Sequence, residues 1–172
     1  MSQPRVGRFE KVSFEQFRKD WAKHFPEDAE DKVRGIYDGI KLPRRATGGS
    51  AGYDFFLPVP VCVAAGEGML IPTGIRVKIA QDWVLCCFPR SGLGFKFRMQ
   101  LDNTAGIIDA DYYGSDNEGH ILCRFTCDAK SDKVIKLDAG DAFIQAIFLP
   151  YGLTEDDDVT DVRNGGFGST DS

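Results

Sequence analysis

Residues 101–114 read LDNTAGIIDADYYG, a segment that combines turn-forming residues, an apolar pair and two nearby carboxylates. Asn103 and Gly106 suit a tight turn, and the residues after them favour a β-hairpin or a bulged strand. In an extended segment Asp109 and Asp111 would point to one face, roughly 7 Å apart. Two interpretations stay open at this point: a hairpin with solvent-facing aspartates, or a site where a carboxylate holds water beside a flat polar ligand.

The overall composition is that of a globular protein. The chain has 172 residues, of which 42% are hydrophobic and 27% charged, enough for one domain with some additional structure. The net charge of −5 argues against a general binder of nucleic acid or membrane surfaces. No apolar run approaches membrane-spanning length, and the N-terminus lacks the apolar core of a signal peptide. We expect a soluble, cytoplasmic protein with neither nucleic acid nor membrane as a partner.

The cysteines do not form a recognisable framework. Their number is odd and no C-x-x-C pair is present, which speaks against a set of disulfides and against a zinc site. We expect all five to be small core residues on strands: Cys62, Cys86, Cys87, Cys123 and Cys127.

The first 40 residues have a helical pattern. Ser13 and Gln16 stand three apart, as in a capping box, and Pro26 separates two helices. Aromatic residues at helical spacing mark the apolar side of the first helix: Phe14, Phe17, Trp21 and Phe25. The buried side of the second would comprise Ala29, Val33, Ile36, Tyr37 and Ile40. We expect residues 1–40 to be a helical extension that packs on the body of the protein or on a neighbouring subunit.

From residue 41 the pattern changes to that of strands. Residues 75–79 and 121–127 alternate between apolar and polar positions, whereas 84–88 is a continuous apolar run. Residues 142–149 form another apolar run, interrupted by Gln145, a buried amide that needs a partner. Glycine and proline punctuate the gaps. Residues 41–152 are therefore expected to form an all-β sandwich or barrel.

The last 20 residues, 153–172, read as a glycine-rich arm. Residues 155–158 are an acidic run typical of a solvated linker, and RNGGFGST follows at 163–170. Glycines let backbone N–H groups approach a phosphate, while Arg163 could grip it and Phe167 could stack on a base. The arm is thus expected to close over a ligand.

Other segments offer donors for a polyphosphate and exclude several enzyme classes. Residues 89–94, PRSGLG, supply a guanidinium, a hydroxyl and accessible N–H groups, and residues 51–54 form a small-residue turn that ends in a carboxylate. A P-loop and a G-x-S-x-G elbow are both missing from the sequence. Neither His24 nor His120 is assigned a catalytic role.

Taken together in this order, five segments resemble the five motifs of the homotrimeric dUTPases, the deoxyuridine triphosphate nucleotidohydrolases. The resemblance covers about residues 40–170, and as a set it is highly specific. The matching segments are 51–54 (AGYD), 89–93 (PRSGL), 106–112 (GIIDADY), the strand that holds Gln145, and 165–170 (GGFGST).

This resemblance implies a distorted jelly-roll-like β-barrel, three copies of which assemble with active sites between neighbours. It also implies hydrolysis of dUTP to dUMP and pyrophosphate, with Mg²⁺ held mainly by the substrate triphosphate and water. Such an enzyme sanitises the nucleotide pool and supplies dUMP for thymidylate synthesis.

The resemblance also assigns roles around the nucleoside. Asp109 would orient the water that attacks the α-phosphorus, and Asn103 with the hairpin backbone would pair with uracil. Tyr112 would pack under the deoxyribose and leave no room for a 2′-hydroxyl. The backbone lining of the pocket would come from Gly106, Ile107 and Ile108.

Further roles concern the phosphates. Arg90, Ser91 and Gly92 would bind phosphate oxygens, and no residue is expected to hold the metal directly. Asp54 and Gln145 would reach it through water.

The arm of another subunit would complete the site. Its Phe167 would cover the uracil. Its phosphate-binding residues would be Arg163, Gly168, Ser169 and Thr170.

The chain departs from the family pattern at several places. Tyr113 stands where many members have arginine, residues 114–119 make a longer and more acidic connection, and Ala142 replaces a common arginine. We interpret Asp111 as an ion-pair partner for Arg90 in preference to a catalytic group.

Two alternatives remain. One is a deoxycytidine triphosphate deaminase on the same fold, although its expected glutamate cannot be placed in this sequence. The other is a nucleotide-gated regulator that uses the helical extension as its partner surface.

Overall fold

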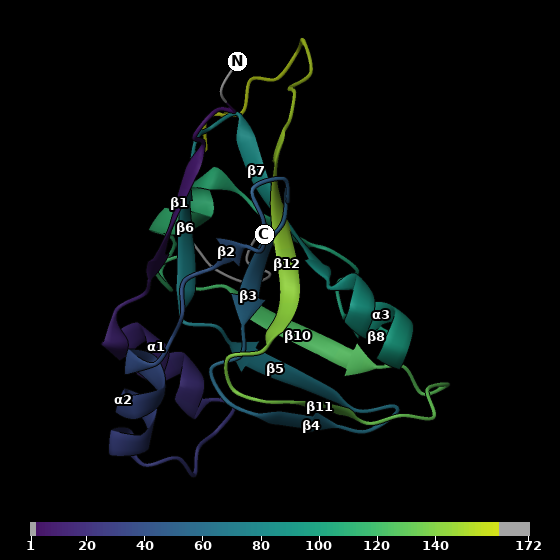
Figure 1. Ribbon diagram of the computed structural model, residues 1–172. Helices are drawn as coiled ribbons and strands as arrows, with labels where there is room; N and C mark the ends of the chain where they lie inside the picture. The colour runs from purple at the N-terminus through teal and green to yellow at the C-terminus, as the bar shows by residue number, and fades with distance from the viewer. Residues whose placement is uncertain (1–2, 162–172) are drawn as a thin grey trace.

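A computed structural model describes residues 3–161 (Figure 1). Its helices are α1 (Phe14–Ala22), α2 (Glu30–Asp38), α3 (Ser91–Phe97) and the 3₁₀ helix η1 (Ala110–Gly114). Its shorter strands, up to four residues each, are β2 (Arg44–Arg45), β3 (Tyr53–Phe56), β4 (Val61–Val63), β8 (Met99–Leu101), β9 (Gly106–Ile108) and β11 (Ile135–Leu137). The longer ones are β1 (Gly7–Lys11), β5 (Gly68–Pro72), β6 (Ile75–Ile79), β7 (Trp83–Pro89), β10 (Leu122–Cys127) and β12 (Ala142–Pro150).

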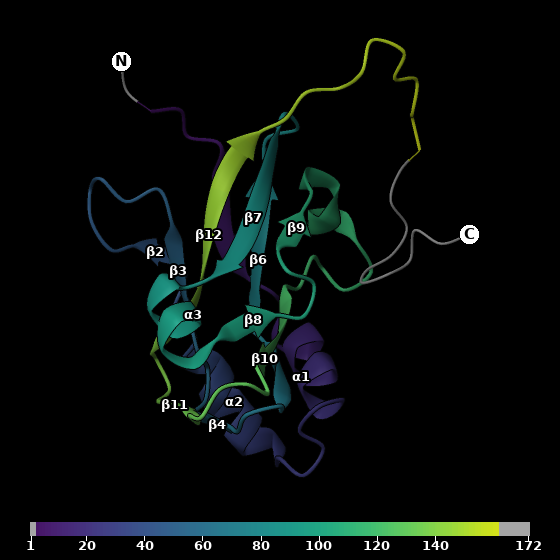
Figure 2. The same ribbon diagram turned by 90° about the vertical axis from the view of Figure 1, so that its right-hand side faces the viewer.

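The strands form a distorted jelly-roll-like barrel made of four antiparallel sheets. The largest has the order β2-β3-β12-β7-β9, and a second has the order β5-β10-β8. The pairs β1-β6 and β11-β4 complete the set. Figures 1 and 2 show β12 and β7 running side by side along the molecule, with β5 and β10 crossing below them.

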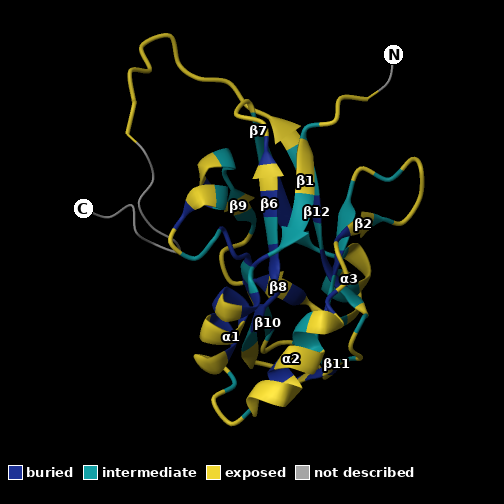
Figure 3. Cartoon of the chain, turned by 90° about the vertical axis from the view of Figure 1, so that its left-hand side faces the viewer, coloured by how far each residue is buried: buried dark blue, intermediate teal, exposed yellow. Residues whose placement is uncertain are grey.

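One hydrophobic core joins these sheets to the N-terminal helices. Phe55, Phe125 and Phe143 contribute from β3, β10 and β12, and each is at most 1% exposed. Phe17 and Trp21 of α1 belong to the same cluster and are equally buried. Figure 3 shows the exposed outer sides of α1 and α2 next to the buried strands. The aromatic stripe of α1 therefore covers the barrel of its own chain.

The strand patterns of the sequence are confirmed. In β6, Ile75, Val77 and Ile79 are buried while Lys78 is exposed, as alternation requires. The continuous apolar run of β7 is buried at residues 85–87, because this strand lies between β12 and β9. No helix within residues 3–161 has the length and apolar character that crossing a membrane would require.

The segment 101–114 is not the expected hairpin. Strand β8 pairs with β10, and β9 pairs with β7, so the two strands belong to different sheets. Residues 110–114 then turn into η1 instead of remaining extended. Asp109 precedes this helix and Asp111 lies within it, so the prediction that both carboxylates share one extended face is wrong.

The N-terminal segment also differs in part from the expectation. Residues 7–11 form β1, an edge strand on β6 that a single apolar residue, Phe9, did not reveal. Ser13 does cap α1, since its hydroxyl accepts from the backbone N–H of Gln16 at 3.1 Å. Phe25 lies beyond the end of α1 and stacks on Trp21, with ring centroids 4.4 Å apart.

The reciprocal half of the predicted capping box is wrong. The Gln16 side chain donates to Asp20 at 2.7 Å, and the backbone N–H of Ser13 donates to Glu118, 105 residues away. The prediction for the cysteines holds for four of them and is wrong for Cys62, which is exposed. Its neighbours in the three-residue strand β4, Val61 and Val63, face the core instead.

Candidate active site

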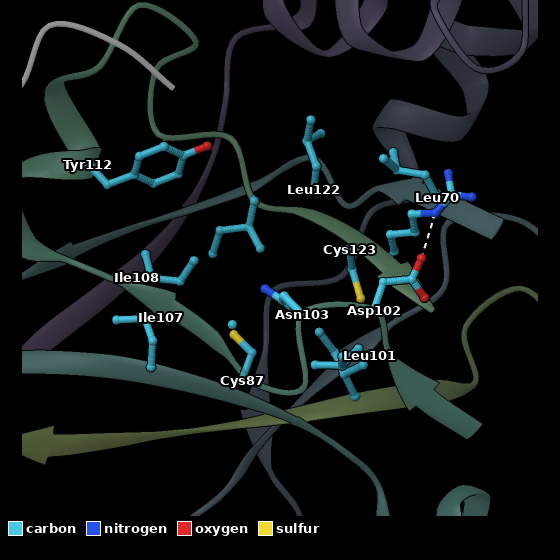
Figure 4. A pocket seen from close by; sticks show the side chains of 14 residues that line it. Leu70, Cys87, Leu101, Asp102, Asn103, Ile107, Ile108, Tyr112, Leu122 and Cys123 are labelled. Carbon is cyan, nitrogen blue, oxygen red and sulfur yellow. Dashed lines mark hydrogen bonds and ion pairs between the residues drawn. The ribbon is translucent and has the colours of Figure 1, made fainter. Parts of the chain in front are cut away.

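A mainly apolar pocket of about 470 Å³ lies beside β9 and η1 (Figure 4). We call it the Tyr112 pocket. Its lining residues are Leu70, Cys87, Leu101, Asp102, Asn103, Gly106, Ile107, Ile108, Tyr112, Ile121, Leu122, Cys123, Arg124 and Ile144. The predicted nucleoside residues Asn103, Gly106, Ile107, Ile108 and Tyr112 are thus brought together in one cavity.

The turn between β8 and β9 forms one end of this pocket. Thr104 has a left-handed backbone, with φ of 66°, and its N–H donates to the carbonyl of Leu101 at 2.9 Å. Gly106 packs so closely on β7 that an added Cβ would lie 3.2 Å from the Cβ of Cys87. The glycine therefore lets the turn pack directly against β7, where a side chain would not fit without a shift.

The floor of the pocket is uncharged. Burial raises the pKa of the Cys87 thiol to about 12, and burial also raises the pKa of Cys123. Both thiols are therefore protonated near neutral pH. The carboxylate of Asp102 is engaged by Arg124 and by Thr126, each at 2.6 Å. An apolar floor with a few polar groups at one end suits a flat heterocycle.

Tyr112 forms a fixed wall of the pocket. It is 5% exposed, and its hydroxyl donates to the backbone carbonyl of His120 at 2.9 Å. The side-chain amide of Asn117 donates to the same hydroxyl at 2.8 Å. Because two hydrogen bonds hold the hydroxyl, the ring presents a defined apolar surface.

Asp109 directly follows Ile108 and precedes Tyr112 by about one turn of η1. Both Ile108 and Tyr112 line the pocket. The backbone carbonyl of Asp109 accepts from the N–H of Tyr112 at 3.3 Å, so the carboxylate is attached to a short structured turn. Asp109 is half-buried. Burial and then the negative charge of Asp109 raise the pKa of the Cys86 thiol, which places this charge beside β7.

A second pocket, of about 450 Å³, lies next to α3, and we call it the Arg90 pocket. It brings together the residues predicted to serve the phosphates. The lining residues are Ala46, Ser50, Gly52, Asp54, Arg90, Ser91, Gly92, Leu93 and Gln145.

Strand pairing explains why these residues meet. Gln145 of β12 lies opposite Asp54 of β3 on one side and Phe88 of β7 on the other. The buried amide predicted at Gln145 is half-buried, and its Nε2 donates to the carbonyl of Pro89 at 3.3 Å. A Cβ on Gly52 would lie 2.9 Å from the Gln145 side-chain oxygen, so this glycine makes room for the amide.

The guanidinium of Arg90 is held in place by its neighbours. Its Nε lies 3.1 Å from a carboxylate oxygen of Asp54, and its Nη1 donates to the carbonyl of Ala142 at 3.4 Å. Within the described residues the ion pair of Arg90 is therefore with Asp54. The pairing with Asp111 that the sequence suggested does not form within one chain, because Asp111 lies in η1 at the other end of β7.

The two pockets lie apart within one chain. Ile144 lines the Tyr112 pocket and its neighbour Gln145 lines the Arg90 pocket, and successive strand residues point to opposite faces. Ile108 pairs with Leu85 of β7, whereas Arg90 follows five residues later, about 16 Å further along at the rise of a strand. Figure 2 shows β9 and α3 on opposite sides of β7. One chain does not bring Asp109 to Arg90.

Some predicted site residues lie outside the described part of the chain, and some observed ones were not predicted. The five candidates of the arm fall in the first group: Arg163, Phe167, Gly168, Ser169 and Thr170. The second group comprises apolar lining residues such as Leu101, Cys123 and Ile144. Their sequence signal was apolar character, in an alternating segment for Cys123 and in an apolar run for Ile144, which marks a core residue and a pocket floor alike.

Comparison with known proteins agrees with this geometry. A family model described as dUTPase matches residues 38–171. The deoxyuridine 5'-triphosphate nucleotidohydrolase of Lactococcus lactis is 37% identical over 135 residues, covering 77% of this chain and 89% of that protein. The Shewanella baltica protein of the same name is 38% identical over 135 residues, covering 74% and 84%.

Solved structures show the same fold. The dUTPase from Streptococcus mutans superimposes with a TM-score of 0.59 at 36% identity, covering 66% of this chain and 88% of that one. A mutant dUTPase from phage phi11 of S. aureus, described with a structural Mg(II) ion, gives a TM-score of 0.56 at 23% identity, with 70% and 90% covered. With a matching family model over most of its length, close relatives and the same barrel, the chain belongs to the dUTPase family.

Proposed function

We propose that this protein hydrolyses dUTP to dUMP and pyrophosphate by attack of water on the α-phosphorus. The observation that carries the proposal is the position of Asp109, attached to the same 3₁₀ turn as Tyr112 and directly after the wall residue Ile108. A carboxylate beside a nucleoside-sized apolar pocket can act on the first phosphate of a nucleotide seated there. Membership of the family and the names of the relatives support the same reaction.

The nucleoside is read by the turn and by Tyr112. The exposed backbone around Gly106 and the amide of Asn103 supply donors and acceptors for the edge of uracil. The Tyr112 ring lies against the sugar and leaves no space for a 2′-hydroxyl. Rejection of ribose then follows from a rigid wall, because a ring whose hydroxyl is fixed by two hydrogen bonds cannot move to accommodate an extra group.

Asp109 orients the attacking water. Its carboxylate accepts one O–H of the water, so an oxygen lone pair faces the α-phosphorus. The new P–O bond forms as the bond from the α-phosphorus to the bridging oxygen breaks, the Asp109 carboxylate takes a proton from the water, and pyrophosphate leaves with the electron pair of the broken bond. Positioning and charge neutralisation account for most of the catalysis in such a transfer, so no covalent nucleophile is needed.

The Arg90 pocket binds the phosphates. The guanidinium of Arg90, the hydroxyl of Ser91 and the backbone N–H of Gly92 are donors for phosphate oxygens. Asp54 keeps Arg90 oriented toward this pocket through their contact at 3.1 Å. The arm, residues 153–172, is proposed to close the site, with Phe167 over the base and with Arg163, Gly168, Ser169 and Thr170 on the phosphates.

Magnesium fits this donor set as an ion carried by the triphosphate. Within residues 3–161, His, Cys, Asp and Glu side chains do not gather in groups of three that could hold a metal. Asp54 and Gln145 offer oxygens in the Arg90 pocket, and oxygen is the donor that Mg²⁺ and its bound waters prefer. When bound, the ion neutralises charge on the phosphates.

The separation of the two pockets supports an active site shared between subunits. A nucleotide in the Tyr112 pocket of one chain needs the Arg90 pocket of another, because its own lies on the opposite face of the sheet. We therefore propose a homotrimer with active sites between neighbours. Residues 1–40, 41–152 and 153–172 act as extension, barrel and arm, and the enzyme draws on the cytoplasmic nucleotide pool.

Pyrophosphate release from separate nucleotides tests the reaction. We expect release from dUTP in the presence of Mg²⁺, at least about a hundredfold less from UTP, and strong inhibition by a chelator. Release of ammonia from dCTP would instead identify a deaminase. Comparable turnover of UTP would contradict the role given to Tyr112, and no turnover of dUTP would contradict the proposed function.

A further inference from the structure

Tyr113 and the connection 114–119 lie against the N-terminal segment. Both contact residues 10–20. Side chains on the N-terminal side of these contacts are Glu10, Ser13 and Asp20, which we call the N-terminal clamp. Their partners are Tyr113, Glu118 and His120.

The contact between Ser13 and Glu118 replaces only the reciprocal half of the capping box, since Ser13 itself still caps α1. The two carboxylate oxygens of Glu118 accept from the Ser13 backbone N–H at 2.7 Å and from its hydroxyl at 2.6 Å. Glu118 has a left-handed backbone, with φ of 59°, which is unfavourable for a side chain of its kind. The loop therefore holds a strained conformation at the residue that binds the start of α1.

The contact between Asp20 and His120 is completely buried. The side chains of Asp20 and His120 are 3% and 0% exposed, and the carboxylate lies 2.7 Å from His120 Nδ1. His120 Nε2 accepts from the backbone N–H of Gly74 at 2.8 Å, so the proton of the neutral ring is on Nδ1 and points at Asp20. Both nitrogens of this ring are thus used to fix its position.

The third contact involves Tyr113. Its hydroxyl donates to Glu10 of β1 at 2.8 Å and accepts from Arg76 of β6 at 2.8 Å. The guanidinium of Arg76 also lies over the Tyr113 ring, 4.2 Å from its centroid. The tyrosine that stands in place of the family's arginine is therefore bound to β1 and β6.

The loop, in turn, holds Tyr112. His120 gives its backbone carbonyl to the Tyr112 hydroxyl, and the hydroxyl of Ser115 donates to the Tyr112 carbonyl at 2.7 Å. The Asn117 amide completes the set at 2.8 Å. A continuous chain of hydrogen bonds thus runs from α1 through His120 to the wall of the nucleoside pocket.

From this chain we infer that the N-terminal clamp is a positioning element of the active site, which sets the Tyr112 ring and thereby the preference for deoxyribose over ribose. The inference rests on the proposed function for the part played by Tyr112. The clamp is not needed to anchor α1, because the buried rings of Phe17 and Trp21 already hold this helix on the barrel. Its polar contacts instead converge on the loop behind one pocket residue.

Substitutions at Asp20 test the clamp in the full-length protein. Asp20→Leu removes the acceptor for His120, whereas Asp20→Asn keeps an oxygen that can accept from Nδ1. Glu15→Ala, an exposed position on the same helix, is the matched control. The readouts are the dissociation constants for dUMP and UMP, and kcat and KM for dUTP and UTP, at a temperature where circular dichroism shows each variant folded.

We call the preference for the deoxynucleotide over the ribonucleotide the deoxy-to-ribo ratio, measured as affinity for dUMP over UMP and as kcat/KM for dUTP over UTP. We expect Asp20→Leu to lower both forms of this ratio about tenfold. Asp20→Asn and Glu15→Ala should keep the wild-type ratio. Glu118→Gly serves as a second test that does not depend on the folding of Asp20→Leu, since glycine relieves the strain at this position while removing the contact with Ser13. It should lower the ratio as well.

If the deoxy-to-ribo ratio is unchanged in Glu118→Gly and in folded Asp20→Leu, even with reduced stability, the inference is overturned. The N-terminal clamp would then be a structural support only. An equal loss in Glu15→Ala would also overturn it. These failures are distinct from failure of the proposed function, in which the wild-type protein does not release pyrophosphate from dUTP.

Discussion

Asp109 is placed by its neighbours and not by a long loop. Ile108 belongs to β9, which is paired with β7, and η1 begins one residue after Asp109. Little backbone freedom remains between these two elements, so the carboxylate can hold a water in a defined position without a large entropic cost on substrate binding.

Replacing Asp109 should remove turnover but not substrate binding. Asp109→Asn keeps the shape of the side chain and loses the charge that accepts from water, so kcat for dUTP should fall about 10²–10⁴-fold while KM changes little. Asp116→Asn is the control, since Asp116 is an exposed carboxylate in the following connection. Steady-state pyrophosphate release measures both. A loss of less than tenfold in Asp109→Asn would contradict the assigned role.

At this scale the sequence predicted which residues lie together in a pocket better than which contacts they make. Asp54 and Gln145 were recognised from their segments, and pairing of β3 with β12 then brings them together. Within one chain the expected contact between Arg90 and Asp111 does not form, because a 3₁₀ turn redirects the chain after Asp109. That turn depends on Ser115 and on partners far away in sequence, which no local pattern reveals.

Among the elements, helix α1 packs tightly against the turn that precedes β6. Gly74 has φ of 71°, and an added Cβ would lie 2.2 Å from Ile40 Cδ1 and 3.3 Å from Phe17 Cδ2. Its N–H also donates to His120. A glycine at this point thus allows the helices to close on the barrel.

Gly74→Ala should destabilise the protein by about 2–4 kcal/mol, from the left-handed backbone and from overpacking against Phe17 and Ile40. Gly35→Ala is a control of opposite sign. Gly35 lies inside α2 with open space around its Cα, so alanine should stabilise the protein by about 0.5–1 kcal/mol. Urea unfolding monitored by circular dichroism measures both, and a Gly74→Ala protein as stable as wild type would contradict the packing argument.

The buried carboxylate of α1 should make stability depend on pH. Burial opposes ionisation of Asp20, but hydrogen bonds from His120, Lys23 and Gln16 outweigh it and hold the pKa of Asp20 well below its usual value. A carboxyl group with a lowered folded-state pKa contributes stability above its unfolded pKa of about 4, and loses that contribution as the pH falls toward the folded value.

Wild-type protein should therefore lose more stability than Asp20→Asn when the pH is lowered from about 7 to 3. Urea unfolding at both pH values gives the two differences. Asp31→Asn, an exposed carboxylate on α2, should behave like wild type. Equal acid sensitivity in wild type and Asp20→Asn would show that Asp20 is not held as an ion.

Secondary structure was predictable where the burial of a strand's faces determines its pattern of apolar residues. The alternation in residues 75–79 and the apolar run in 84–88 gave β6 and β7, since burial on one or both faces imposes these patterns. Strand β1 was missed because GRFEK, an edge strand on β6, carries a single large apolar side chain. It is stabilised by pairing with a strand some 65 residues away, which the sequence of the segment does not express.

For the whole molecule, the separation of the Tyr112 and Arg90 pockets predicts complementation between inactive chains. Asp109→Asn and Ser91→Ala each damage a different pocket, so each homo-oligomer should be nearly inactive. In randomly mixed oligomers, about one quarter of the shared sites take both intact pockets from different chains. Co-refolding the two variants in equal amounts should restore about a quarter of wild-type turnover, whereas a site built within one chain would restore none.

The hydrogen bonds between Ser13 and Glu118 join positions 105 residues apart, and this distance has a consequence for synthesis of the chain. Residues 13–22 leave the ribosome long before residue 118 is made, so the backbone N–H and the hydroxyl hydrogen of Ser13 must be hydrated until then. Translation that stops short of residue 118 would yield a nascent chain in which Ser13 caps the helix through Gln16 without the support of Glu118. The protein's beginning is therefore completed only after two thirds of it exists.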